Sequence, residues 1–123
     1  MKKAPLLPEE VIVWYIIPAI RRELTVTLYK KGLKQSEIAK LLNLTNAAVS
    51  QYLKAKRATT IKFDDETLKI LEEAAESILE NDDLENLIRQ IENIINYLRK
   101  TRKICKIHSD LNNRIPDECT ACI

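Results

Sequence analysis

The three cysteines and the single histidine of this chain all lie within its last nineteen residues. Their spacing is Cys105-x2-His108-x10-Cys119-x2-Cys122. Two ligands separated by two residues can bind one metal ion from a single turn, and four nitrogen and sulfur donors complete a tetrahedron. Because the surrounding residues are polar and offer no obvious core, we predict that these four side chains bind Zn²⁺, with an iron–sulfur cluster as the alternative centre. The alternative without a metal is a Cys119–Cys122 disulfide or redox pair, with His108 incidental.

A second informative segment is QSEIAKLLNLTNAAVSQYLK, residues 35–54. Its apolar residues have the spacing of two short helices that bury one side around a tight turn. Asn43 lies in the turn, where the backbone needs a positive φ, and Thr45 can cap the second helix. Ala39 is small where the two helices must cross closely. The segment therefore predicts a helix-turn-helix.

With Thr45 as the N-cap, helix geometry turns Val49 and Tyr52 inward and leaves a face of small polar residues outside. This face consists of Asn46, Ala47, Ser50 and Gln51. Amide groups form two hydrogen bonds with adenine, a hydroxyl can form a hydrogen bond with several bases, and a methyl group can contact the methyl group of thymine. We therefore predict that these four residues contact base edges in the major groove.

Polar and basic residues around the same two helices are placed to contact DNA phosphates. They are Gln35, Thr45, Lys34, Lys40, Lys54, Lys56 and Arg57.

The charge of the chain is divided between its two halves. Residues 1–60 carry eleven Lys or Arg against four Asp or Glu, a net charge of +7. Residues 61–123 carry nine against fourteen, a net charge of −5. A basic half favours a polyanionic partner such as double-stranded DNA.

The elements that position these residues are expected to be helices, because the chain has one Gly and four Pro and therefore few turn signals. We predict a buried helix over 11–17, interrupted at Pro18, and further helices over 18–31, 64–80 and 82–103. The domain organisation is a helix-turn-helix core at 8–63, C-terminal helices at 64–104 and a metal-binding tail at 105–123.

The last long helix carries an apolar stripe whose members are separated alternately by four and three residues, the spacing of a coiled coil. They are Leu84, Ile88, Ile91, Ile95 and Leu98. Since the stripe covers barely two heptads, we expect it to pack on its own domain, on a second copy of the chain, or on both. We predict a homodimer formed through it.

The stretch at 11–57, VIVWYIIPAIRRELTVTLYKKGLKQSEIAKLLNLTNAAVSQYLKAKR, resembles the helix-turn-helix region of the Cro/repressor-like (XRE) superfamily. It also resembles a group of predicted archaeal transcriptional regulators, in which Pro-Ala-Ile-Arg precedes the motif and Ala-Ala-Val-Ser-x-Tyr-Leu forms the recognition helix. Asn43 departs from the usual turn Gly. The resemblance implies a dimeric, sequence-specific DNA binder with a five-helix core and no enzymatic activity.

Several other classes are disfavoured. One Gly leaves no Gly-rich phosphate loop, and no catalytic constellation is visible. The apolar run at 11–17 is too short to span a bilayer and lacks a signal-peptide cleavage site. An odd number of cysteines fits a reducing compartment, so we expect a cytoplasmic protein.

We therefore predict an all-α, five- to six-helix Cro/repressor-like domain with long C-terminal helices and a metal-binding tail, acting as a transcriptional regulator. The alternatives are a zinc-binding protein-interaction adaptor without a specific DNA target, and a redox enzyme that uses Cys119 and Cys122.

Overall fold

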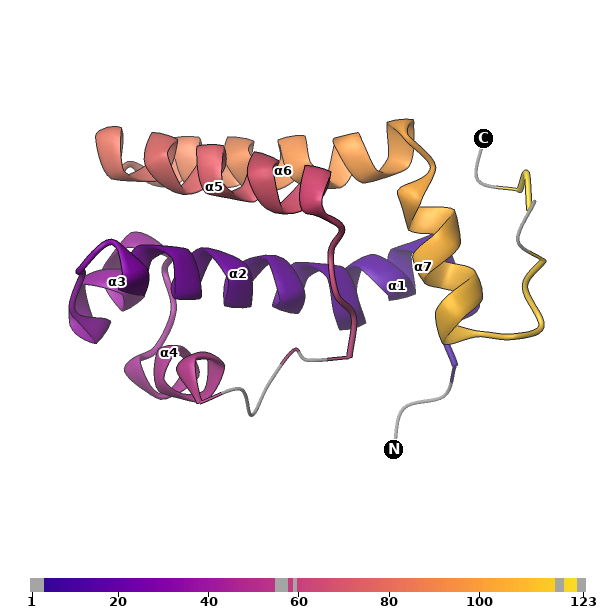
Figure 1. Ribbon diagram of the computed structural model, residues 1–123, viewed down its shortest axis with the longest axis horizontal. Coiled ribbons are helices and arrows are strands. Elements are labelled where there is room, and N and C mark those ends of the chain that lie inside the picture. Colours follow the sequence, from indigo (N-terminus) through magenta and orange to yellow (C-terminus); the bar gives the residue numbers. More distant parts are fainter. Residues whose placement is uncertain (1–3, 55–57, 59, 117–118, 122–123) are drawn as a thin grey trace.

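The computed structural model describes residues 4–54, 58, 60–116 and 119–121, and in this part of the chain every regular element is helical. This confirms the predicted all-α class. In chain order the elements are α1 (Pro8–Val11), the π-helical η1 (Ile12–Ile16), α2 (Ile17–Lys30), α3 (Gln35–Leu41), α4 (Asn46–Leu53), α5 (Asp65–Glu80), α6 (Leu84–Lys100) and α7 (Lys103–Leu111) (Figure 1). Among these elements none is both long enough and apolar enough to cross a membrane.

The elements α1, η1 and α2 form one continuous helical rod (Figure 1). The run at 11–17 is helical as expected, but it is buried on one face only: Val11 and Ile16 are fully buried, whereas Val13 is 60% exposed. Pro18 was expected to interrupt it, because a proline has no N–H to donate and its ring clashes with the carbonyl one turn earlier. The helix instead widens by one π turn just before the proline, where the N–H of Ile17 donates to the carbonyl of Ile12, and then continues.

The rod is the central element of the fold. The helix α5 packs on one side of α2 and α4 packs on the opposite side, while α3 lies at the end of α2 and contacts both α2 and α4 (Figure 1). The helix α6 packs on α5. At the opposite end α7 packs on α1 and on α6. The buried apolar residues from Val11 to Cys105 form one cluster. The three predicted segments therefore share a single hydrophobic core.

The chain after residue 100 differs from the prediction. A helix was expected to reach residue 103, but α6 ends at Lys100 and Arg102 adopts a left-handed conformation with φ 63°. The helix α7 then leaves in a new direction and buries Cys105 and His108. The expectation that no core is available to this part of the chain is therefore wrong for both residues. Apolar or buried side chains at 104, 105, 108 and 111 have helical spacing, a signal that the prediction overlooked.

The apolar stripe of α6 is divided between the core and the surface. Ile95 and Leu98 are buried within their own chain, and Ile91 is half-buried. Leu84 and Ile88, one turn apart, are 56% and 62% exposed. Of the five residues predicted to form a dimer contact, the last two therefore belong to the core of the monomer.

Thr25 of α2 is a buried polar residue whose hydroxyl has no hydrogen-bond partner among the described residues. A buried hydroxyl without a partner costs more than an apolar group of the same shape. We therefore expect Thr25→Val to raise the free energy of unfolding by about 1 kcal/mol, measured by urea denaturation.

Thr67 offers a matched control for this substitution. It is equally buried, but its hydroxyl donates to the carboxylate of Asp64. Thr67→Val should therefore lower the free energy of unfolding, by about 1 kcal/mol. Equal effects of the two substitutions would contradict the assignment.

Candidate nucleic-acid interface

The turn between α2 and α3 caps the C-terminus of α2 and the N-terminus of α3. Gly32 has φ 98°, its N–H donates to the carbonyl of Tyr29, and the N–H of Leu33 donates to the carbonyl of Leu28. These bonds satisfy the last carbonyls of α2 in the way that a left-handed residue after a helix permits. The carboxylate of Glu37 then accepts from the N–H of Lys34 at 2.9 Å. Gln35, the first residue of α3, is exposed beside this turn.

The turn between α3 and α4 also has a residue with a positive φ after the helix, here Asn43 and not a glycine. Asn43 has φ 55°, as predicted, and the N–H of Leu44 donates to the carbonyl of Ala39 at 2.8 Å. Asn tolerates this conformation better than other residues with a side chain beyond Cβ. Ala39 is buried, which agrees with its predicted place at the crossing of the two helices.

The orientation of α4 follows the predicted geometry. The hydroxyl of Thr45 accepts from the N–H of Ala48 at 3.0 Å and caps the helix. Val49 and Tyr52 are buried at 0% and 3% exposure. On the other face Asn46, Ala47 and Gln51 are exposed and Ser50 is half-buried. The four residues that were predicted to contact bases therefore share an accessible side of one helix.

The outer face of α4 lies away from the acidic helices. The helix α4 packs on α2 and α3, and in Figure 1 it lies on the opposite side of α2 from α5 and α6. The acidic residues of α5 and α6 therefore do not cover this face. This is the arrangement that an approach of a polyanion to α4 requires.

Exposed cationic side chains lie at the start of α3, within α3 and at the end of α4. Lys34, Lys40 and Lys54 are all exposed, and Lys54 directly follows α4. Lys56 and Arg57, which were also predicted to contact phosphates, lie outside the described residues.

The predicted metal ligands lie on α7 and on the segment after it. Cys105 and His108 are one helical turn apart on α7 and both are buried. Cys119 is half-buried, and its carbonyl accepts from the guanidinium of Arg102 at 2.8 Å, so the segment after α7 returns toward the beginning of that helix. Cys122 lies outside the described residues. In the part of the chain that the structure describes, no group of three His, Cys, Asp or Glu could hold a metal ion.

His108 has a structural partner that the sequence did not reveal. Its Nε2 lies 3.0 Å from the carbonyl oxygen of Pro5, and the side-chain amide of Asn112 donates to the same oxygen at 3.1 Å. Because a carbonyl can only accept, Nε2 is the protonated ring nitrogen. A neutral ring then keeps Nδ1 as its acceptor, and such a bond is the kind that orients a metal-binding histidine. It also anchors the N-terminal segment to α7.

The zinc prediction can be tested by metal content. If the four predicted ligands bind Zn²⁺, anaerobically purified protein should contain about one zinc per chain. The double variant Cys119→Ser/Cys122→Ser should contain none, but it should keep the helix content of the wild type, because α7 packs on α1 and α6. Zinc-free wild-type protein with full helix content would contradict the prediction.

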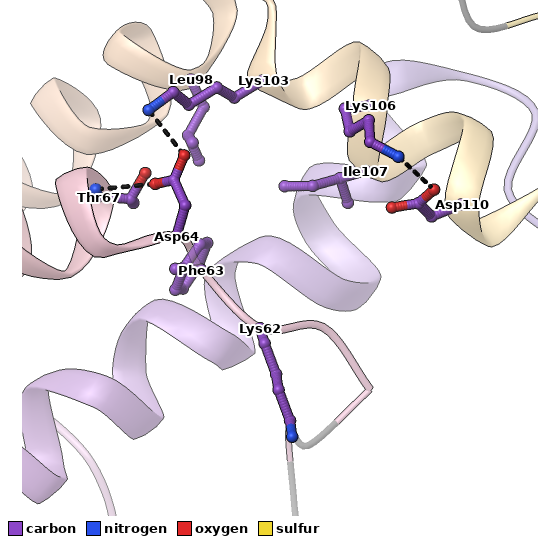
Figure 2. A pocket seen from close by; sticks show the side chains of 9 residues that line it. All are labelled: Lys62, Phe63, Asp64, Thr67, Leu98, Lys103, Lys106, Ile107 and Asp110. Atoms are coloured by element: carbon purple, nitrogen blue, oxygen red, sulfur yellow. Dashed lines mark hydrogen bonds and ion pairs between the residues drawn. The ribbon is translucent and has the colours of Figure 1, made fainter.

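A hollow of about 320 Å³ lies where α7 meets the beginning of α5 (Figure 2). Lys103 extends along it to Asp64, with Nζ 2.8 Å from Oδ2, while Lys106 pairs with Asp110 at 3.1 Å. Asp64 also caps α5, since its carboxylate accepts from the N–H of Thr67 at 2.9 Å. One carboxylate therefore both starts α5 and connects it to α7.

The contacts around Lys103 shift the pKa values of Asp64, Glu66 and Lys103 itself. The hydrogen bond from Lys103, followed by those from Thr67, lowers the pKa of Asp64 from 3.8 to about 2. The pKa of Glu66 is also lowered, first by a hydrogen bond from the Tyr97 hydroxyl and then by one from Lys103. The pKa of Lys103 is raised, mainly by its bond to Asp64.

These shifts predict a loss of stability in acid. The folded-state pKa of Asp64 is depressed, so its contribution to stability is present above pH 3.8 and is lost as the pH falls toward about 2. We expect the free energy of unfolding to decline over this interval in the wild type and to decline less in Asp64→Asn, since Asn also caps a helix but does not titrate. Parallel declines in the two proteins, followed by circular dichroism in urea, would refute this role.

Comparison of the chain with family models, with curated proteins and with solved structures found no match. The resemblance of residues 11–57 to the Cro/repressor-like superfamily therefore stays a prediction that depends on those residues themselves.

Proposed function

We propose that this protein is a sequence-specific DNA-binding transcriptional regulator whose recognition helix is α4. The observation that carries the proposal is the orientation of this helix. Val49 and Tyr52 hold it against the core, and Asn46 and Gln51 are exposed on its outer side. An α-helix fits the major groove, and short side chains on its outer face allow it to approach base edges closely.

The residues of this surface divide into two roles. Asn46, Ala47, Ser50 and Gln51 have the donors, acceptors and methyl group that distinguish base pairs. Lys34, Lys40 and Lys54, with Gln35 and the capped end of α4 at Thr45, supply contacts to phosphates, which position the helix without reading sequence. The first group is on α4 and the second lies on α3 and at the two ends of α4. Because α3 packs on α4, we expect the two groups to act on a single stretch of the duplex.

The distribution of charge supports the same orientation. The first sixty residues carry +7 and the remainder −5, and the helices α5 and α6 lie on the far side of α2 from α4 (Figure 1). A polyanion is attracted to the basic side and repelled by the acidic side, so the charge distribution turns α4 toward DNA during encounter. Such attraction is weakened by salt, which makes it measurable.

The experiment is a titration of a genomic fragment selected by the protein, at several salt concentrations, with fluorescence anisotropy as the readout. The wild-type affinity should fall steeply with salt, and Lys54→Ala should reduce the slope of log affinity against log salt by about 1. Gln51→Ala should cost about 1–3 kcal/mol on the selected sequence and much less on a scrambled one.

Matched control variants come from the exposed side of α6. Lys100→Ala removes a cation and Asn93→Ala removes an amide, both exposed and on the far side of α2 from α4. Neither should change the affinity for the selected fragment beyond the small general effect of net charge. Binding that is insensitive to salt, or that responds equally to Asn93→Ala and Gln51→Ala, would overturn the proposed function.

A further inference from the structure

The side of α4 that faces away from the core carries no charged group. The helix has eight residues, and its inward side chains, which include Val49 and Tyr52, are buried. The outward residues are Asn46, Ala47, Ser50 and Gln51. Their functional groups are two amides, a methyl group and a hydroxyl, so any contact of this face with a base is uncharged on the side of the protein.

An uncharged face restricts which base pairs the helix can read. In the major groove guanine is bound by Arg or Lys, and the amino group of cytosine by Glu or Asp. None of the eight residues of α4 belongs to these four types. An amide fits adenine instead, because its oxygen accepts from N6 and its nitrogen donates to N7. Against guanine the same amide oxygen meets the acceptor O6 and has no donor to bond to.

The spacing of the two amides determines how far apart the base pairs that they reach can be. Asn46 and Gln51 are five residues apart, which at about 1.5 Å per residue is roughly 7.5 Å along the helix. Two steps of about 3.4 Å between base pairs cover roughly the same distance. A helix that follows the groove therefore brings the amides to base pairs about two steps apart. Ala47 and Ser50 then lie near the pair between them.

The beginning of α4 is fixed by hydrogen bonds, so its short side chains have one register against the bases. The hydroxyl of Thr45 accepts from the N–H of Ala48 at 3.0 Å. In the preceding turn the N–H of Leu44 donates to the carbonyl of Ala39 at 2.8 Å. A preorganised surface loses less entropy on binding, and a backbone that is held in place cannot shift to accommodate a different base pair.

We propose that the base pairs beneath α4 in the operator are A·T pairs, an inference that rests on the regulator function proposed above. Two adenines about two steps apart bond to Asn46 and Gln51, and a thymine methyl group between them contacts the methyl group of Ala47. Guanine and cytosine are excluded from this core because no side chain of α4 completes their hydrogen bonds. Cations such as Lys54 contact phosphates and add affinity without selectivity.

The first test selects duplexes from a randomised library with the wild type, with Asn46→Ala and with Gln51→Ala. The wild type should enrich one sequence, and each variant should lose the preference at a different position, the two positions being about two base pairs apart. Both positions should hold A·T pairs in the wild-type selection. Asn93→Ala removes an exposed amide of α6 and is the matched control, which should select the wild-type sequence. G·C pairs at the two amide positions overturn the inference.

The second test changes single groups of the selected duplex. Inosine paired with cytosine keeps the minor-groove edge of an A·T pair but presents the major-groove edge of guanine. At either amide position it should weaken binding of the wild type by about 10- to 100-fold, and it should cost the corresponding alanine variant little. Uracil in place of the central thymine removes one methyl group and should weaken binding by about 4-fold. Equal affinities of the wild type for the A·T and inosine duplexes overturn the inference.

The third test exchanges one reading side chain and looks for a gain that misfolding cannot imitate. Gln51→Arg introduces the side chain that bonds to O6 and N7 of guanine. This variant should prefer G·C at the position read by Gln51 and keep the A·T preference at the position read by Asn46. A variant that keeps its helix content by circular dichroism but still prefers adenine at the first position overturns the assignment of Gln51 to that base pair.

Salt separates this inference from the function on which it rests. Because the discriminating groups are uncharged, the ratio of the affinities for the A·T and inosine duplexes should stay constant with salt while both affinities fall. A ratio that collapses with salt assigns base readout to a cation such as Lys54, which overturns the inference and leaves the regulator standing. A salt-dependent binder that enriches a G·C core has the same consequence. Binding without an enriched sequence and without salt dependence overturns the regulator and this inference together.

Discussion

The burial of α2 on both sides is the constraint on which the rest of this structure depends. Ile20, Leu24 and Leu28 are completely buried, and so are Val11 and Ile16 earlier in the same rod. Each such side chain contributes about 1.5–3 kcal/mol when it is removed from water, so the rod must be covered along its length. The helix α5 packs on one side of α2, α4 packs on the opposite side near the end of the rod where α3 lies, and α7 packs on α1 (Figure 1).

This arrangement determines how the proposed DNA surface is presented. Because α4 packs on α2 and α3 and buries Val49 and Tyr52, its opposite face points away from the core. The cap at Thr45 and the turn at Asn43 fix where the helix begins. A rigid helix start matters for a surface of short side chains, since short side chains cannot compensate for a misplaced backbone when they approach base edges.

The C-terminal helices have two structural roles. The hairpin of α5 and α6 completes the core while keeping most of the acidic residues on the far side of α2 from α4 (Figure 1). The helix α7 connects distant parts of the chain: Lys103 reaches Asp64 at the start of α5, and His108 reaches the carbonyl of Pro5. His108, which sequence spacing grouped with the metal ligands, therefore also ties the N-terminal segment to the C-terminal helix.

The sequence by itself determined the local features. These features are the left-handed residues Gly32 and Asn43, the helix caps at Thr45, Asp64 and Asp83, and the inward side of α4. Each depends on interactions within about four residues. They were predictable because such signals are encoded in neighbouring side chains. What covers an apolar face was decided only by the tertiary structure. The stripe of α6 has uniform spacing, yet Leu98 enters the core and Ile88 does not, and Cys105 and His108 became buried because α7 turns back onto α1. The periodicity of apolar residues in the sequence indicates that one face of a helix is apolar. Which helix packs against that face depends on the tertiary structure.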